Sequence, residues 1–563
     1  MKKILISFII IIMIGVLGFF FGKNYLHKYT YTRERADLNA YLGIEDEHQY
    51  PVIYRGEKSE IEAREFDGEI YIPFETAADI FNSRFYYSTA DRMLFYCLPD
   101  DRVSAALGSD TWALDSGKST TEAYQIIRED EEGRIWMALP FLKGYANFSW
   151  QAYTSPNRLV LTDSWEPYRV ASLKKDSAIR VSGGVKSEIV ADLMAGTQVR
   201  ILEEMDNWSK VMTHDGLYGY IENKELENYG DASEPPVTDF QEPEYPSLSL
   251  GGKVNLAWHQ IAGTGGNDTY YGLIANTKAV NVVSPTWFHL NDNGQVESFA
   301  AQFYVDAAHS QGYQVWAVFD NFSTGKAYGK FLEKDQYRSH VIGSLIDYCR
   351  RYGIDGINID IENLAENHGS DFIEFIRELS IRTHKEGLIL SVDNYVPYNF
   401  NDHYHMDEQG VFADYVILMG YDEHFQGSEA AGSVASIGYV TYGIQEAMQM
   451  VPAEKLINGI PFYARIWTTS GDGSVTSQAC TMEVVQQYLE RNGMNPEWSE
   501  ADGQYYADRR VGDSLYQVWV EDDESIALKL NVMEEAGLAG VAEWCLGFET
   551  PDIWDVIAEY MER

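Results

Sequence analysis

The sequence predicts an α/β protein whose largest part is a (β/α)8 barrel. From residue 252 to the end, short apolar strands alternate with helical segments, which is typical of parallel βα units. The strands number eight, and the ~310 residues involved suit a barrel of ordinary size with insertions. We expect them at Lys253–Gln260, Val280–Phe288, Gln314–Asp320, Gly356–Glu362, Leu388–Val396, Tyr415–Tyr421, Leu456–Ala464 and Gly540–Leu546. A doubly wound sheet is the alternative, but Gly263–Gly266 is a loose match to its phosphate-binding turn.

The N-terminus predicts a membrane anchor over residues 1–35. Lys2 and Lys3 precede an almost unbroken apolar run from Ile4 to Phe21, close to the ~20 residues that cross a bilayer. No small-residue cleavage site follows this run, so we expect a single-pass cell-membrane protein with most of the chain extracellular. Cleavage, which would give a secreted protein, is the alternative.

Residues 36–165 are expected to form a small duplicated α+β domain. Glu69–Phe74 and Arg134–Pro140 each read as a strand that leads into a short helix and then two further strands. This arrangement resembles the stalk-like domain named after the N-terminus of copper amine oxidases. The resemblance carries no catalytic residues.

Residues 166–229 read as short strands separated by glycine-containing turns. Asn207–Val211, followed by Asp215–Ile221, resembles a bacterial Src-homology-3 barrel, which implies a cell-wall-binding module; a spacer without a ligand is the alternative. The proline-containing segment 230–250 is expected to be a linker before the barrel at 251–563.

Composition narrows the classes of partner. The formal net charge of −43 argues against nucleic acid, whose phosphates require Lys and Arg, and favours a neutral polymer such as a glycan. The four cysteines show no CxxC or metal-ligand spacing, so we expect buried free thiols. We expect neither a cofactor nor a metal.

The strand at Gly356–Glu362 carries the most informative pattern. Because side chains alternate along a strand, Asn358, Asp360 and Glu362 share one face and three isoleucines share the other. Burying polar groups inside a barrel costs several kcal/mol, and active sites lie at the C-terminal ends of barrel strands. The pattern therefore predicts catalytic carboxylates at this strand end.

This segment resembles the strand-four signature of glycoside hydrolase family 18, Asp-x-x-Asp-x-Asp-x-Glu, which reads Asp355-x-x-Asn358-x-Asp360-x-Glu362 here. The variant is similar to the spore-cortex-lytic and peptidoglycan N-acetylglucosaminidase branch. The resemblance implies that Glu362 protonates the glycosidic oxygen, while the substrate's own acetamido carbonyl attacks the anomeric carbon, with Asp360 orienting the acetamide. Asn358 replaces the usual Asp; we expect it to donate a hydrogen bond to Asp360 and to alter the pH profile.

Other strand ends fit the same family. The resemblance implies a catalytic role for Tyr421, which would hold the acetamide carbonyl. It also implies substrate-binding roles for Asn358, Met419, Asp422, Tyr463, Arg465 and Trp544, with Trp544 flooring the sugar site. Asn394 and Tyr395 are weaker candidates. Residues 468–531 form a segment longer than an ordinary connection between a barrel strand and the next helix. We expect this segment to be an insertion that deepens the cleft.

The function implied is a retaining hydrolase of β-1,4-linked N-acetylglucosaminyl bonds. Peptidoglycan is favoured over chitin because an anchor and small modules precede the barrel. The expected partners are this polysaccharide, the bacterial cell wall through the Src-homology-3-like module, and the membrane. A chitinase, a glycan-binding lectin that does not cut, and a surface scaffold are the alternatives.

Overall fold

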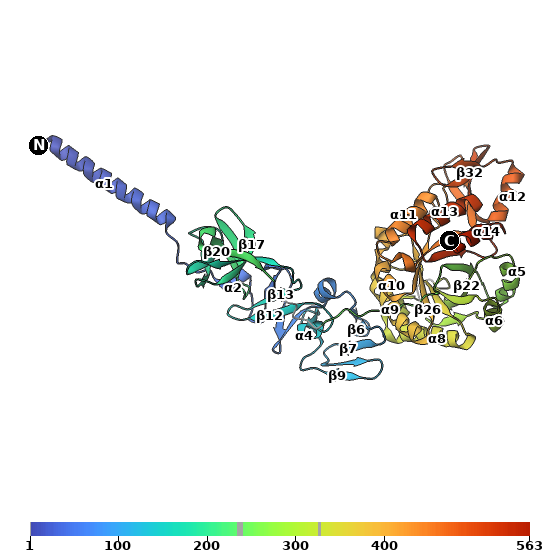
Figure 1. Cartoon of the computed structure of the whole chain (residues 1–563), viewed down its shortest axis with the longest axis horizontal. Coiled ribbons are helices and arrows are strands. Elements are labelled where there is room, and N and C mark those ends of the chain that lie inside the picture. The colour runs from blue at the N-terminus through green and yellow to red at the C-terminus, as the bar shows by residue number, and fades with distance from the viewer. Residues whose placement is uncertain (1, 234–239, 325–327) are drawn as a thin grey trace. The chain divides into compact units, whose positions relative to one another are not determined.

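The computed structural model describes residues 2–233, 240–324 and 328–563, apart from some side chains within helices α1 (Lys2–Tyr29) and α7 (Tyr328–Glu333). The described chain divides into two compact units. The first comprises residues 1–85, 105–113 and 118–242, and the second comprises 86–104, 114–117 and 243–563. Figure 1 shows the elements of each unit. Part of the predicted 230–250 linker lies outside the described residues.

A closed parallel barrel dominates the second unit. The order around it is β21, β34, β28, β27, β26, β25, β24 and β22, and β21 pairs with β22 to close the ring. The predicted barrel is therefore confirmed. Its strands are β21 (Val254–His259), β22 (Val282–Leu290), β24 (Gln314–Asp320), β25 (Gly356–Asp360), β26 (Ile389–Tyr395), β27 (Tyr415–Met419), β28 (Leu456–Pro461) and β34 (Gly540–Trp544).

Helices alternate with these strands and surround them (Figure 1). They are α5 (Tyr270–Ile274), α6 (Gln302–Ser310), α8 (Asp335–Tyr352), α9 (Gly369–Glu386), α10 (Met406–Phe412), α11 (Ile437–Ala447), α13 (Asp523–Ala536) and α14 (Ile553–Glu562). Both α8 and α9 end where glycine adopts a left-handed conformation, at Gly353 and Gly387, which L-residues with a Cβ adopt at a cost. Each turn then leads directly into the next strand.

The predicted alternation along β25 is present. Ile357 and Ile359 are fully buried and belong to the large apolar cluster around the barrel. Asn358 and Asp360 are also buried, on the other face, and the parallel register sets Asp320 of β24 beside Asp360 and Ser391 of β26 beside Asn358. A polar patch thus occupies the barrel interior near the C-terminal ends of three adjacent strands.

The insertion between β28 and α13 is a small domain with its own core. Its antiparallel sheet runs β30-β29-β33-β32-β31, with β29 (Tyr463–Thr469), β30 (Val475–Thr481), β31 (Glu497–Ser499), β32 (Gln504–Val511) and β33 (Ser514–Val520), and α12 (Met482–Asn492) packs on it. The predicted strand Leu456–Ala464 is wrong at its end. Tyr463 and Ala464 already pair with β30, so the barrel strand stops at Pro461.

The second unit also includes strands from the N-terminal half of the chain. They are β5 (Tyr86–Ser88), β6 (Met93–Cys97) and the first part of β7 (Arg102–Ala106). The Arg102 guanidinium lies 2.6 Å from Glu378 on α9, and the Tyr245 hydroxyl donates to the Cys97 carbonyl at 2.9 Å. All four cysteines are buried free thiols that form no disulfide bond, as predicted.

The first unit contains two sets of sheets. The predicted order of a strand, a short helix and two strands occurs twice. The first occurrence begins at β4 (Glu69–Pro73) and continues to β5 and β6. The second begins at β11 (Ile135–Ala138) and continues to β12 (Ser149–Tyr153) and β13 (Arg158–Thr162). A second, seven-stranded sheet runs β16-β15-β19-β18-β17-β14-β20. Its strands are β14 (Tyr168–Leu173), β15 (Ser177–Arg180), β16 (Ile189–Leu193), β17 (Gln198–Glu204), β18 (Trp208–Met212), β19 (Tyr218–Glu222) and β20 (Leu226–Ala232).

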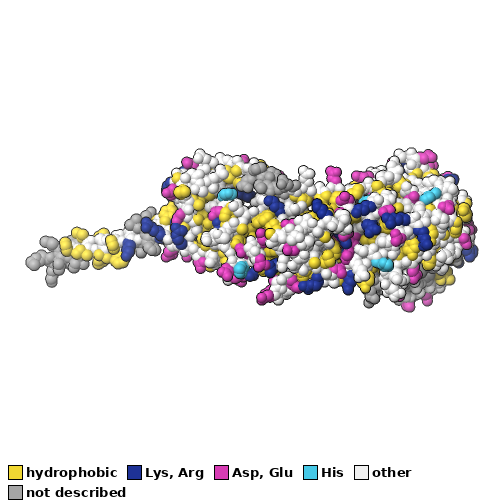
Figure 2. Space-filling view, turned by 90° about the horizontal axis from the view of Figure 1, so that it is seen from below, with side chains coloured by type: hydrophobic (Ala, Val, Ile, Leu, Met, Phe, Trp, Pro, Cys, Tyr) yellow, Lys and Arg dark blue, Asp and Glu magenta, His cyan; other side chains and the backbone are white. Residues whose placement is uncertain are grey.

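The N-terminal segment forms helix α1 (Lys2–Tyr29). Apolar side chains such as Ile11 and Phe21, 66% and 73% exposed, cover much of its described surface (Figure 2). The predicted transmembrane helix is nevertheless not confirmed. Within the described part of the chain, no helix combines the length and the hydropathy that crossing a membrane requires.

Candidate active site

The C-terminal end of β25 brings two carboxyl groups together inside the barrel mouth. Asp360, the last residue of the strand, is 6% exposed, and Oδ1 of its carboxyl has no hydrogen-bond partner among the described residues. Glu362 follows two residues later and is half-buried. Burial first, and then the charges of Asp393, Glu362 and Asp320, raise the pKa of Asp360 well above its usual value. The site therefore holds several carboxyls that cannot all ionise at low cost.

Glu362 is held both at its side chain and at its backbone. The Tyr395 hydroxyl donates to its Oε2 at 2.7 Å. The Asn321 side chain clamps its backbone: Nδ2 donates to the Glu362 carbonyl at 2.9 Å, and the Glu362 amide donates to Oδ1 at 3.0 Å. Burial is the largest cause that raises the pKa of Glu362, with Asp422 and Asp320 adding to it and Tyr395 opposing it. A carboxyl with a raised pKa retains a proton closer to neutral pH, as a general acid must.

The expected hydrogen bond from Asn358 to Asp360 is wrong. The Asn358 amide nitrogen donates instead to Ser391 Oγ at 3.0 Å and to Asp393 Oδ1 at 2.7 Å. Because a primary amide has two N–H donors, both are used. Its oxygen accepts from the Trp258 indole at 2.9 Å. Asn358 thus links β25 to the neighbouring strand and lies below the reacting carboxyls.

Tyr421 and Asp422 follow β27, which is two strands away from β25 around the barrel. Burial first, and then nearby Tyr463, Asp393 and Asp360, raise the pKa of Tyr421, which keeps its hydroxyl protonated as a donor. Asp422 is exposed, adopts φ of +58°, and accepts a 2.6 Å hydrogen bond from the Tyr463 hydroxyl. The Tyr421 and Tyr463 rings meet edge to face, with centroids 6.4 Å apart.

An aromatic wall lies beside these groups. Trp544, half-buried at the end of β34, contacts Trp258 of β21 at an angle of 62°, with ring centroids 5.8 Å apart. Met419, at the end of β27, is 8% exposed. An apolar ring next to carboxyls and a tyrosine hydroxyl suits a sugar, which presents both an apolar face and polar edges.

The comparisons with known proteins agree with this geometry. Residues 258–549, more than half of the chain, match the model of glycosyl hydrolases family 18. The chain belongs to glycosyl hydrolase family 18. Residues 176–227 match the bacterial SH3 domain, which confirms the predicted module. No match supports the predicted copper-amine-oxidase-like stalk.

Several relatives of this hydrolase come from Bacillus species. The uncharacterized glycosylase YvbX of Bacillus subtilis is 25% identical over 309 residues, covering 52% of this chain and 88% of its own. The cortical fragment-lytic enzyme of the same organism is 25% identical over 246 residues, covering 41% of this chain and only 56% of its own. The spore cortex-lytic enzyme SleL of Bacillus cereus shares the fold, with a TM-score of 0.51 and 20% identity over 58% of this chain and 78% of its own.

Two sequence candidates of the hydrolase lie outside this cluster. Arg465 is on β29 of the insertion, where its Nη1 donates to Ser477 Oγ at 3.1 Å, and its charge lowers the pKa of Tyr463 against the larger effect of burial. Asn394 turns toward α10 and exchanges hydrogen bonds with Gln409 at 2.6 and 3.1 Å. Tyr395, the other weak candidate, contacts Glu362 directly.

Sequence reasoning missed Asp393, Asp320, His289 and Trp258. Asp393, on β26, is 3% exposed, and Asp320 is fully buried at the end of β24, where it pairs with His289 Nδ1 at 2.9 Å. The Asp320 carboxylate, opposed by burial, raises the pKa of His289. Each residue lies in the C-terminal half of a barrel strand, so the strand-end rule applied to Gly356–Glu362 would have pointed to them. Among the described residues, no three His, Cys, Asp or Glu side chains are grouped to hold a metal ion.

Proposed function

We propose that this glycoside hydrolase cleaves β-1,4-linked N-acetylglucosaminyl bonds of peptidoglycan with net retention. The observation that carries the proposal is the pair Asp360 and Glu362, one sealed at the strand end and one reaching the surface, both with raised pKa values. The spore cortex-lytic and cortical fragment-lytic relatives support peptidoglycan as the substrate.

The proposed reaction has two steps. Glu362 donates its proton to the glycosidic oxygen as the bond to the anomeric carbon breaks, and the carbonyl oxygen of the substrate's acetamide forms a bond to that carbon. The resulting oxazolinium ion carries positive charge, which ionised Asp360 stabilises through the acetamide N–H. Water then attacks the anomeric carbon from the side of the departed group and gives its proton to Glu362, which restores the acid.

Tyr421, Asp422 and Trp544 have distinct proposed roles. The Tyr421 hydroxyl, kept protonated, donates to the acetamide carbonyl and directs it toward the anomeric carbon. Asp422 binds sugar hydroxyls and, by its charge, helps to keep Glu362 protonated. The Trp544 ring supports the apolar face of the sugar. Met419 and Tyr463 shape the wall around the sugar, and Asn358 fixes the strand beneath it.

The decisive experiment compares the full chain with its Glu362→Gln variant. Purified peptidoglycan and chitin are digested side by side, and new reducing ends are identified by mass spectrometry. We expect N-acetylglucosamine reducing ends from peptidoglycan, and a loss of about 10²–10⁴-fold in rate for the variant, with binding retained. Release from chitin alone would make the protein a chitinase. Binding without release by both proteins would make it a lectin.

We also propose that the hydrolase acts at the cell surface. The apolar run Ile4–Phe21 supports a membrane attachment of the N-terminal segment, the SH3 module supports wall binding, and residues 36–165 would serve as a stalk. Cell fractionation with a tagged chain, beside a chain that lacks residues 1–35, tests this proposal. Recovery of the full chain in the cytosolic fraction would contradict it.

A further inference from the structure

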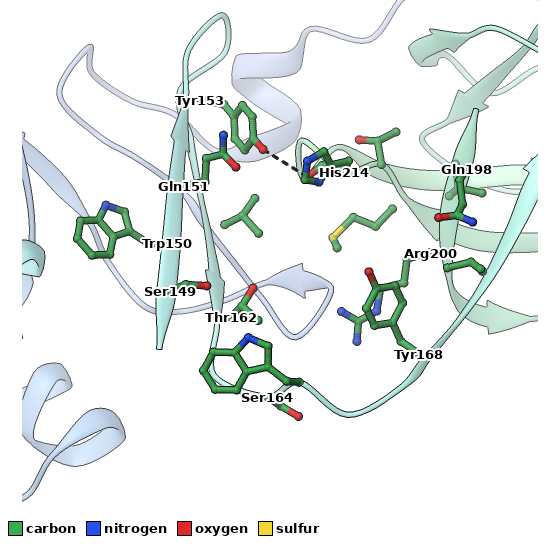
Figure 3. Close-up of a pocket in the computed structure, with 16 residues that line it drawn as sticks. Ser149, Trp150, Gln151, Tyr153, Thr162, Ser164, Tyr168, Gln198, Arg200 and His214 are labelled. Atoms are coloured by element: carbon green, nitrogen blue, oxygen red, sulfur yellow. Dashed lines mark hydrogen bonds between the residues drawn. The ribbon is translucent and has the colours of Figure 1, made fainter. Parts of the chain in front are cut away.

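A pocket lies within the first unit, where the β12–β13 pair faces the seven-stranded sheet of the SH3 module (Figure 3). Its volume of about 330 Å³ lies within the ~300–1,000 Å³ typical of small-molecule sites. Ser149, Gln151 and Tyr153 face the pocket from β12, whereas the Trp150 ring lies on the other side of that strand. Arg200, Gln198 and Tyr168 line the opposite wall.

The walls of this pocket are held rigidly. Arg158 of β13 donates to the Asp215 carbonyl and carboxylate, both at 2.6 Å, and the Tyr153 hydroxyl donates to the His214 carbonyl at 3.4 Å. A Cβ on Gly216 would lie 2.5 Å from the Val160 side chain, so glycine is required for this close approach. The two walls are therefore fixed relative to each other without a ligand.

The lining combines an apolar floor with polar walls. Val170, Val199 and Met212 are buried at the floor, and the half-buried Trp165 adds an aromatic ring. Gln151 and Gln198 are exposed, and each amide can both donate and accept hydrogen bonds. Apolar rings beside amides fit the faces and the hydroxyl or acetamido groups of a saccharide.

The charged residues of the lining indicate which kind of saccharide the pocket would bind. None of the 16 lining residues is Asp or Glu, although the chain has a net charge of −43. Arg200 has no acidic partner in the described parts of the chain, and its guanidinium stacks 4.4 Å from the centroid of the Tyr168 ring. Nearby Arg158 and Arg169, by contrast, each pair with a carboxylate. An unpaired guanidinium in such a pocket fits an incoming carboxylate.

We propose that this pocket binds a carboxylate-bearing N-acetylated saccharide, such as one in which the lactyl carboxylate of muramic acid is free of peptide. Arg200 binds the carboxylate, Trp165 and Tyr168 contact the sugar faces, and Gln151 and Gln198 bind the acetamido and hydroxyl groups. The inference rests on the proposed wall-binding role of the SH3 module and is independent of catalysis at Glu362. The module would then bind the glycan strand while the barrel cleaves it.

Titration calorimetry on the full chain carrying Glu362→Gln tests the proposal without consuming the probe. Two probes are compared: N-acetylglucosaminyl-N-acetylmuramic acid, and diacetylchitobiose, which lacks the carboxylate. We expect the muramic disaccharide to occupy a site that Arg200→Ala or Trp165→Ala weakens at least tenfold. Arg200→Ala should leave diacetylchitobiose binding unchanged. Arg169→Ala, an arginine of the same module outside the pocket, is the matched control and should bind normally.

A second measurement locates the site even if a variant is unstable. The chain is labelled with 5-fluorotryptophan and observed by fluorine NMR. The resonance that is missing from the spectrum of Trp165→Phe belongs to Trp165, and it should shift when the muramic disaccharide is added. No such shift, or disaccharide binding insensitive to Arg200 and Trp165, would overturn the proposal. So would a carboxylate-ended dipeptide that binds as tightly as the disaccharide, because the site would then recognise peptide. Hydrolysis is assayed separately with the chain that keeps Glu362. In that chain, Arg200→Ala should leave the rate of hydrolysis of soluble oligosaccharides unchanged.

Discussion

The side-chain amide of Asn358 donates a 2.7 Å hydrogen bond from Nδ2 to Oδ1 of Asp393 on the neighbouring strand. Asp393 is also the largest electrostatic contributor, after burial, to the raised pKa of Asp360. The family signature has a carboxyl at position 358, and here the second buried carboxyl is on β26 instead. Burial is the largest cause that raises the pKa of Asp360 and of Asp393 alike, and the hydrogen bond from Asn358 opposes it at Asp393.

The first prediction exchanges these two groups. Asn358→Asp would set a second acceptor against Asp393, so the new carboxyl would have a folded-state pKa above its unfolded value. We expect a loss of stability of about 1–3 kcal/mol that is present at pH 8 and declines as pH falls through the raised folded pKa. Adding Asp393→Asn restores one donor and one acceptor and should recover most of the loss. Urea denaturation at pH 5 and pH 8 measures both effects, and a double variant no more stable than Asn358→Asp would contradict the pairing.

The second prediction concerns the pKa of the general acid, Glu362. The Tyr395 hydroxyl lowers the pKa of Glu362 and the Asp422 charge raises it. Tyr395→Phe should therefore move the alkaline limb of the kcat/KM profile to higher pH, and Asp422→Asn should move it to lower pH, because the protonated acid is the active form. Tyr442→Phe, whose hydroxyl contacts the Pro397 carbonyl, is the control and should not shift it. Shifts in the same direction for both variants would be inconsistent with Glu362 as the acid.

The third prediction concerns a buried ion pair behind the insertion. Lys529 Nζ lies 2.9 Å from Glu521 Oε2, and the two side chains are 1% and 0% exposed. Lys529→Met leaves a buried carboxylate without its cation, so we expect the free energy of unfolding to fall by about 3–5 kcal/mol near neutral pH. Burial raises the pKa of Glu521, and this loss should shrink as low pH protonates it. The control is Lys278→Met, whose partner Asp555 is exposed; about 0–1 kcal/mol is expected.

The fourth prediction uses a close approach at β28. A Cβ on Gly459 would lie 3.0 Å from Cε1 of Tyr421 and 3.1 Å from the Leu418 carbonyl. Gly459→Ala should displace the Tyr421 ring and lower kcat about tenfold or more, because its hydroxyl would no longer be aligned. Gly343→Ala, on α8 with open space around it, should leave kcat unchanged and add about 0.5–1 kcal/mol of stability. Equal activity of the two variants would contradict a positioned Tyr421.

Local patterns in the sequence were sufficient to predict the barrel and the two carboxyls at the centre of its candidate site. Strands such as Gln314–Asp320 are predicted to the residue, because apolar runs between helical segments reflect burial of both strand faces. Glu362 and Asp360 are found because the alternation along one strand is local, and a carboxyl inside a barrel violates the usual apolar interior. The SH3 strands follow from periodicity and turn residues in the same way.

Only the tertiary structure determined which groups meet. Asp393, Asp320 and Trp258 lie on three different strands, and their closeness to Asp360 or Asn358 depends on the parallel register and closure of the barrel. A hydrogen bond between residues 35 positions apart leaves no local pattern, so Asn358 was assigned the wrong partner. The pocket around Arg200 likewise exists because two separately folded sheets pack together. Periodicity reports which face of an element is buried, whereas the partners on that face are fixed by long-range packing.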